Sequence, residues 1–266
     1  MMNCKNIKTH QGKQAYKLYL GACVVLCSVV VSAVAVAQNY LPSGRLPKIT
    51  IGGKQVLTNE QMKHNTVDSD LPEALKNDRT KMAIENRRRI QIWNHTPFRG
   101  PVAAPITWVE MNDMSCLYCQ DLSQKIDEIF KKDKYKGKIQ HFFMHLPVDK
   151  YNFTNAAAFY GRLAFGAGEF WDYRQSLYNV SSATDNIFTE KLISVGVPEK
   201  EIRRMTRKNA RQYYKELDAD RTAVQSMGEH KPPVLYVNGI KIGGSITLEQ
   251  LESLMDYEIK LYERSL

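Results

Sequence analysis

The chain has 266 residues, of which 43% are hydrophobic, and a formal net charge of +9. This length and composition suit one or two globular domains with an adequate core. The sequence shows no stripe of basic residues interleaved with aromatics, so we do not expect a nucleic-acid-binding protein.

The first 37 residues have the pattern of an export signal. A leader with four lysines and no acidic residue is followed by an uncharged, mostly apolar run over residues 18–37. The run ends in Ala35-Val36-Ala37, the small-x-small pattern that a signal peptidase cuts. We therefore predict a signal peptide over 1–37 and a periplasmic location.

Two other uses of this segment stay open. The apolar run is close to the roughly 20 residues that span a bilayer, so it would also serve as an uncleaved anchor in the inner membrane. The stretch Leu20-Gly21-Ala22-Cys23 resembles a lipobox, although the apolar run before it is very short. Cleavage after Ala37 would lower the net charge to +5 (33 basic minus 28 acidic residues) and would leave only two of the five cysteines.

Residues 38–98 form an N-terminal extension with two expected elements. The stretches 48–51 and 54–57 flank a Gly-Gly pair and predict a small hairpin. Asp70 and Glu73 have capping-box spacing and precede a run without a helix breaker, which predicts one long charged helix over 71–94. Because isolated hairpins and helices are marginal in water, this extension must pack on its own domain or on a second chain.

A βαβ unit is expected next. Residues 106–111 (ITWVEM) predict a buried strand, 120–132 have helical spacing, and 138–146 (KIQHFFMHL) predict a second, parallel strand. Two cysteines lie between the first strand and the helix, in the stretch MNDMSCLYCQDL.

The remainder predicts a helical segment and a closing ββα unit. Residues 153–227 have helical patterns throughout, and strands return at 234–237 and 240–242 around an Asn-Gly turn. A final helix is expected over 248–261 with Thr247 as its cap. The sequence therefore predicts an α/β domain formed by 99–150 and 228–266, with a helical domain inserted at 151–227.

The two cysteines have the spacing needed for thiol-disulfide exchange. That reaction needs one exposed thiolate of low pKa and a second thiol within reach, and a CxxC at a helix start supplies both. Amide N–H groups and the helix dipole stabilise the anion, so we expect Cys116 to be the nucleophile and Cys119 to resolve the mixed disulfide. A purely structural disulfide is the alternative, but a bridge closing so short a loop restricts the unfolded chain little.

These motifs together resemble the DsbA-like family of thioredoxin-fold disulfide oxidoreductases. The resemblance covers about residues 99–262 and rests on the CxxC, the insertion with AAFYGRLAFGAGEFWDYRQSLY, and the closing KPPVLYVNGIKIGGSITLEQLESLM. It implies a thioredoxin fold with an inserted helical domain, here preceded by the hairpin-plus-helix extension. It also implies a reaction that needs neither a metal nor an organic cofactor.

The resemblance also suggests roles for five further positions around the cysteine pair. Glu110 stands where similar proteins place a buried acid that moves protons to or from the deeper thiol; an exposed glutamate at a strand end is the alternative. Pro233 matches the family's cis-proline, whose loop faces the cysteines and docks an extended substrate.

The residues beside these positions depart from the family pattern. Leu117 and Tyr118 replace the Pro-His pair of strong oxidants between the cysteines, so no imidazolium stabilises the thiolate. Pro232, before the cis-proline, has no N–H to offer a substrate strand. We expect all three side chains to contact substrate.

A zinc-binding structural module is a different interpretation of the same region. Cys116, Cys119, His141 and His145 form a C-x2-C...H-x3-H pattern. The two histidines lie in a predicted strand, however, where residues four apart are about 13 Å from each other. On that spacing they do not share one ion.

The sequence thus predicts an exported thiol-disulfide oxidoreductase that acts on cysteine-containing polypeptides, with an oxidase favoured over an isomerase. Its expected partners are a membrane redox protein that reoxidises or reduces the CxxC and, through residues 38–98, a second copy of the chain. An isomerase or reductase, or an assembly factor with secondary redox activity, is the alternative.

Overall fold

Five strands form the central sheet of the fold, in the order β3-β5-β4-β6-β7. They are β3 (Phe98–Arg99), β4 (Ile106–Asn112), β5 (Ile139–His145), β6 (Val234–Val237) and β7 (Ile240–Gly243). β4 and β5 are parallel, and every other neighbouring pair is antiparallel. The predicted α/β class and thioredoxin fold are therefore confirmed.

The structure is a computed structural model that describes residues 54–55, 69–148, 153–178, 180, 185–243 and 246–264. The predicted export segment and the strand expected at 48–51 lie outside these residues. Within the described part, no helix is long and apolar enough to cross a bilayer.

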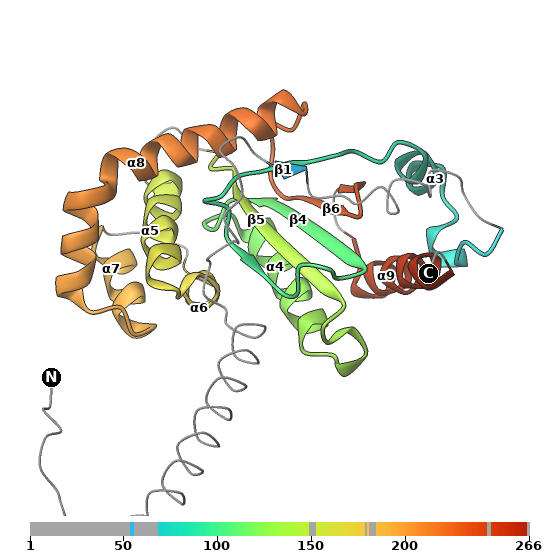
Figure 1. The fold of residues 1–266 in the computed structure, drawn as a ribbon, viewed down its shortest axis with the longest axis horizontal. Helices are drawn as coiled ribbons and strands as arrows, with labels where there is room; N and C mark the ends of the chain where they lie inside the picture. Colours follow the sequence, from blue (N-terminus) through green and yellow to red (C-terminus); the bar gives the residue numbers. More distant parts are fainter. Residues whose placement is uncertain are drawn as a thin grey trace, which may run out of the picture. The chain divides into compact units, whose positions relative to one another are not determined.

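The helices lie on the sheet and at one end of it (Figure 1). The elements are the helices α3 (Asp78–Glu85), α4 (Leu117–Phe130), α5 (Phe153–Ala167), α6 (Phe170–Ser176), α7 (Asp185–Ser194), α8 (Glu199–Ser226) and α9 (Leu248–Arg264), with single 3-10 turns at Glu73–Leu75 and Asp133–Tyr135. α5 to α8 gather at the same side of the sheet, where the predicted insertion begins and ends. As predicted, Thr247 caps α9, because its hydroxyl accepts from the backbone N–H of Gln250.

Alternation along β4 gives the sheet two apolar faces. Ile106 and Trp108 pack with α4 and α9 on one face. Val109 and Met111 pack on the other face, with β2 (Gln91–Ile92) and the end of α8. Because successive strand residues point to opposite faces, Glu110 shares the face of Trp108, beneath α4.

The turn between β6 and β7 has the conformation that its sequence predicts. Asn238 has φ 47° and Gly239 has φ 80°, the positive values that an Asn-Gly hairpin turn requires. The Asn238 side chain also accepts from the backbone N–H of Thr107 at 2.7 Å, so the turn is joined to the start of β4.

The long helix predicted over 71–94 is wrong. The segment instead contains one 3-10 turn, the short helix α3 and the strand β2. Asn77 caps α3 by accepting from the N–H of Thr80, and Ile90 and Ile92 alternate into the core on the α8 side. Burial of these isoleucines in an extended segment outweighs the helical propensity of the charged residues before them.

The predicted capping box is also wrong. The carboxylate of Asp70 does not begin a long helix but pairs with Lys260 and Arg264 at the end of α9. The strand β1 (Lys54–Gln55) exists and pairs antiparallel with β2.

The described part of the extension packs on its own domain. Leu71, Leu75 and Ile84 belong to the apolar core beneath α9. Arg87 makes two hydrogen bonds of 2.7 Å to the buried carboxylate of Glu258 on α9. Residues 69–98 are therefore an integral layer of the fold and not a solvated arm.

Candidate redox site

The cysteine pair lies where β4 passes into α4. Cys116 is the residue before the helix and has an extended backbone, and Cys119 is in the first helical turn. The carboxylate of Asp113 shapes the loop by accepting from the backbone N–H and hydroxyl of Ser115 and from the N–H of Val148. Both cysteines are free thiols.

The two thiols differ in exposure and acidity. Cys116 is partly exposed, whereas Cys119 is fully buried. Burial and a hydrogen bond with Cys116 raise the pKa of the Cys119 thiol well above its usual range. Cys119 is therefore a neutral thiol at rest, and Cys116 is the sulfur that a partner can reach from solvent.

Glu110 is fully buried beneath the start of α4, so the alternative of an exposed strand-end glutamate is wrong. Its Oε1 accepts from Asn112 and from Ser123, each at 2.5 Å. Asn112 also donates to the backbone carbonyl of Cys119 at 3.3 Å. Asn112 thus connects the acid to the backbone of the deeper cysteine.

Glu110 holds its negative charge at neutral pH. Burial alone would raise the pKa of this carboxyl, but Arg174, His141 and Ser123 outweigh burial and lower the pKa to about 2. His141 Nε2 lies 2.9 Å from Glu110 Oε2. In the resting state this group is therefore a carboxylate, which can accept a proton but has none to give.

His141 is a neutral neighbour of this carboxylate. Burial, with the charges of Arg99 and Arg174, lowers the pKa of the ring to about 4 against the opposing effect of Glu110. Its Nδ1 accepts from Arg99 Nε at 3.3 Å, which leaves the proton of the neutral ring on Nε2, directed at Glu110.

A second acid and two arginines complete the buried network. Asp127 on α4 pairs with Arg99 at 2.6 Å and with Arg174 at 3.3 Å. Arg174 also lies 3.7 Å from Glu110. Two carboxylates therefore face two guanidinium groups, so the buried charges balance.

Sequence reasoning missed Asn112, Ser123 and Arg174. Both Asn112 and Ser123 lie within a few residues of the predicted site. The strand repeat on β4 and the helical repeat on α4 would have indicated that these two side chains face Glu110. Arg174 comes from α6 in the inserted helices and has no local signal of this role.

The cis-proline loop lies at the same end of the sheet as the cysteine loop. The Pro232-Pro233 bond is cis, as predicted from the register counted back from Asn238. In the antiparallel pairing of β4 and β6, Val234 lies opposite Met111. Pro233 therefore precedes β6 just where β4 ends and leads into the cysteine loop.

An apolar surface surrounds the exposed thiol. The side chain of Leu117 is 62% exposed and that of Tyr118 is 81% exposed. Val148, whose N–H is bonded to Asp113 of the cysteine loop, is 58% exposed. Leu117 and Tyr118 thus expose apolar surface directly beside Cys116 in the chain.

The two histidines of the zinc alternative lie in different surroundings. His141 and His145 both lie on β5, as predicted, and both are buried. His141 faces Glu110, whereas the ring of His145 packs against Phe143 and Phe170. Among the described residues, no group of three His, Cys, Asp or Glu side chains could hold a metal ion.

The fold and the cysteine pair are those of thioredoxin-fold thiol-disulfide oxidoreductases. A thioredoxin family model matches residues 94–257, and the chain belongs to this family. Comparison with curated protein sequences gave no match.

Several solved structures share this fold at low sequence identity. The thiol-disulfide exchange protein alpha-DsbA2 of Wolbachia pipientis is 19% identical, with a TM-score of 0.55, over 61% of this chain and 86% of that one. Oxidised BdbD of Bacillus subtilis is 19% identical, with a TM-score of 0.54, over 62% and 94% of the two chains. The catalytic domain of Proteus mirabilis ScsC is 17% identical, with a TM-score of 0.53, over 71% and 94%.

Proposed function

We propose that this chain is an exported thiol-disulfide oxidoreductase that oxidises cysteine pairs in periplasmic polypeptides. The observation that carries the proposal is the asymmetry of the cysteine pair at the start of α4, where Cys116 is accessible and Cys119 is a buried thiol of raised pKa. The sequence of the first 37 residues and the cysteine-poor remainder support export.

The oxidation follows from this asymmetry. A substrate thiolate attacks Cys116 Sγ of the oxidised pair, which breaks the Cys116-Cys119 bond and forms a mixed disulfide. Cys119 leaves with the electron pair and takes up a proton, because burial disfavours its thiolate. A second substrate thiolate then attacks the substrate sulfur and releases Cys116. The substrate loses two electrons, the pair gains them, and a membrane redox partner must remove them again.

Glu110 would take part in the reverse step, in which Cys119 becomes the nucleophile. When Cys119 attacks the mixed disulfide, its thiol must lose a proton in a site closed to water. The Glu110 carboxylate, connected to this region through Asn112 and Ser123, is in the state that can accept that proton. Because its pKa is about 2, it is a weak base, and we assign it a moderate share of the rate.

Substrate would dock beside Cys116 on two surfaces. Leu117 and Tyr118 offer apolar contact, and the loop with Pro232 and Pro233 precedes β6 at the same end of the sheet. Since Pro232 has no N–H, backbone pairing there would rely on carbonyl oxygens as acceptors.

The packing of the extension favours an oxidase over an isomerase. The family resemblance implies that isomerases pair their active sites through amino-terminal extensions, whereas residues 69–98 of this chain are packed on their own domain. Pairing of two chains through the rest of 38–98 stays a prediction, tested below.

Oxidation of a reduced model polypeptide that contains a cysteine pair, by the oxidised protein, tests the proposal. We expect catalysis by the native protein and none by Cys116→Ser. Equal turnover by both proteins would show that the cysteine pair is structural.

A further inference from the structure

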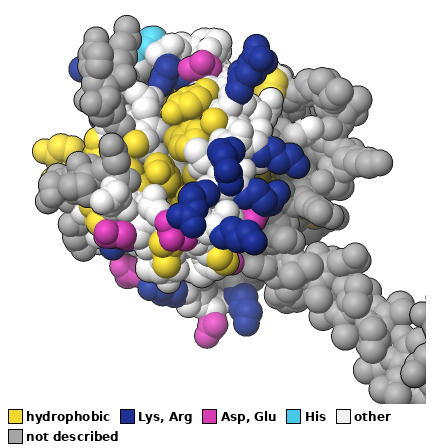
Figure 2. All heavy atoms as spheres, turned by 90° about the vertical axis from the view of Figure 1, so that its left-hand side faces the viewer, with side chains coloured by type: hydrophobic (Ala, Val, Ile, Leu, Met, Phe, Trp, Pro, Cys, Tyr) yellow, Lys and Arg dark blue, Asp and Glu magenta, His cyan; other side chains and the backbone are white. Residues whose placement is uncertain are grey.

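The outer face of α8 holds a concentration of positive charge. Residues 203–215 contain six Lys and Arg residues and no acidic residue. The inner face of the helix is apolar and contributes Ile202, Met205, Tyr213 and Leu217 to the core. Figure 2 shows Lys and Arg side chains gathered on this side of the molecule, beside a band of hydrophobic side chains.

Four of these cations are exposed and have no acidic partner among the described residues. Arg203 and Arg204 pair with Glu199 and Glu201. The remaining four, which we call the α8 cation row, are Arg207, Lys208, Arg211 and Lys215. This row is inconspicuous in the sequence, because the cations are interleaved with the buried residues of an amphipathic helix.

The spacing of the row is unfavourable for the helix itself. Arg207 and Arg211, and Arg211 and Lys215, are four residues apart, so like charges are neighbours on one face. Each such pair of like charges destabilises the helix. A partner of opposite charge would remove this repulsion.

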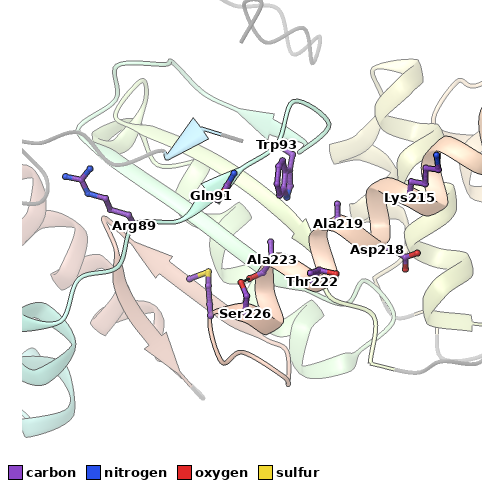
Figure 3. Close-up of a pocket in the computed structure, with 10 residues that line it drawn as sticks. Arg89, Gln91, Trp93, Lys215, Asp218, Ala219, Thr222, Ala223 and Ser226 are labelled. Carbon is purple, nitrogen blue, oxygen red and sulfur yellow. Dashed lines mark hydrogen bonds between the residues drawn. The ribbon is translucent and has the colours of Figure 1, made fainter. Parts of the chain in front are cut away.

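A hollow adjoins each end of the row. One, of about 750 Å³, lies between α7 and α8 and is lined by Ile193, Arg203 and Arg207. The other, of about 660 Å³, lies between β2 and the second half of α8, with Lys215 at its edge. Figure 3 shows Trp93 on the β2 side pointing toward the α8 residues of this second hollow.

We propose that the α8 cation row and its two hollows bind an acidic, extended segment of a partner polypeptide. Carboxylates would pair with the row, and an apolar side chain at each end would enter a hollow beside Ile193 or Trp93. α8 has 28 residues and so is about 42 Å long, which an extended segment of about twelve residues matches. A bilayer surface would meet the cations but has no side chains to fill the hollows.

This surface is separate from the exchange reaction. None of its residues belongs to the cysteine loop or to the cis-proline pair. It would hold a client or a redox partner while the thiols react, and its test does not depend on thiol chemistry.

Fluorescence anisotropy with a labelled, cysteine-free peptide of about twelve residues, with Glu residues in the middle and a Leu at each end, tests the proposal. We expect the native chain to bind it at low salt and to lose affinity as salt rises. The triple variant Lys208→Gln/Arg211→Gln/Lys215→Gln should bind about tenfold more weakly, because it loses three exposed ion pairs of about 0.5 kcal/mol each.

Matched controls separate the row from net charge and from the proposed function. Arg79→Gln/Lys131→Gln/Lys136→Gln removes the same charge at other exposed sites and should bind the peptide like the native chain. Cys116→Ser should also bind it normally, even if the exchange activity proves absent in every variant. Equal loss in both triple variants, or binding to phosphatidylglycerol vesicles without binding to the peptide, would overturn the proposal.

Discussion

Arg174 Nη1 lies 3.7 Å from Glu110 Oε2, although 64 residues separate them in the sequence. The contact joins α6 of the inserted helices to the acid beneath the cysteine pair. Both side chains are almost completely buried. The inserted segment is therefore part of the electrostatic surroundings of the redox site.

Replacing Arg174 by Met should strongly destabilise the protein. Glu110 and Asp127 would stay buried with one guanidinium fewer, and leaving a buried charge uncompensated costs about 3–5 kcal/mol. Urea unfolding at neutral pH measures the change. Arg204→Met, which removes an exposed arginine paired with Glu201, should destabilise the protein far less. Similar losses in the two variants would contradict the charge balance described here.

Stability should fall as the pH is lowered from neutral. His141 has a folded-state pKa of about 4, below its usual 6.5, so its contribution is present above pH 6.5 and is lost between 6.5 and 4. Glu110 has a folded-state pKa of about 2, below its usual 4.5, so its contribution is lost between 4.5 and 2.

Unfolding free energies at a series of pH values test whether stability falls as the pH is lowered. His141→Gln keeps an N–H donor but does not titrate, so it should reduce the slope between pH 6.5 and 4. A native protein that gains stability on acidification through pH 6 would exclude this assignment.

Glu110→Gln should slow the step in which Cys119 resolves a mixed disulfide. We expect a loss of about tenfold, because the carboxylate that receives the proton is replaced by an amide of the same shape. Rapid mixing with a preformed Cys116 mixed disulfide measures this step. Asp127→Asn removes a buried carboxylate of the same network that does not contact Asn112, and it should lower stability without slowing resolution.

The local elements could be predicted from the sequence because periodicity and turn residues encode them. The parallel β4 and β5 and the Asn238-Gly239 turn follow from short-range signals, whereas the cis bond at Pro233 follows from the resemblance to a family. The extension could not be predicted in this way. Ile90 and Ile92 are buried by contacts with β6 and α8, more than 130 residues away, and such contacts override local propensity.

The site divides along the same line. The CxxC spacing predicts the roles of Cys116 and Cys119, and the resemblance to a family predicts that of Glu110. The groups that set the charge of Glu110 come from three elements, and Arg174 reaches it only because α6 packs over α4. Sequence spacing contains no information on that contact.

Pairing of two chains through residues 38–68 stays a prediction. A chain starting at Pro97 would lack Arg87, the buried partner of the Glu258 carboxylate, and the apolar residues that 69–96 contribute to the core. The two chains to compare are therefore one that starts after Ala37 and one that starts at Ser69. Light scattering should give an oligomer for the first and a monomer for the second, and one mass for both would remove the oligomer proposal.

Alkylation of the reduced protein by limiting iodoacetamide at neutral pH, followed by mass spectrometry of peptides, tests the central claim most directly. The exposed position of Cys116 at the start of α4 and the raised pKa of buried Cys119 predict that Cys116 is labelled first and Cys119 only after unfolding. Faster labelling of Cys119 in the folded protein would contradict the assigned roles and the reaction built on them.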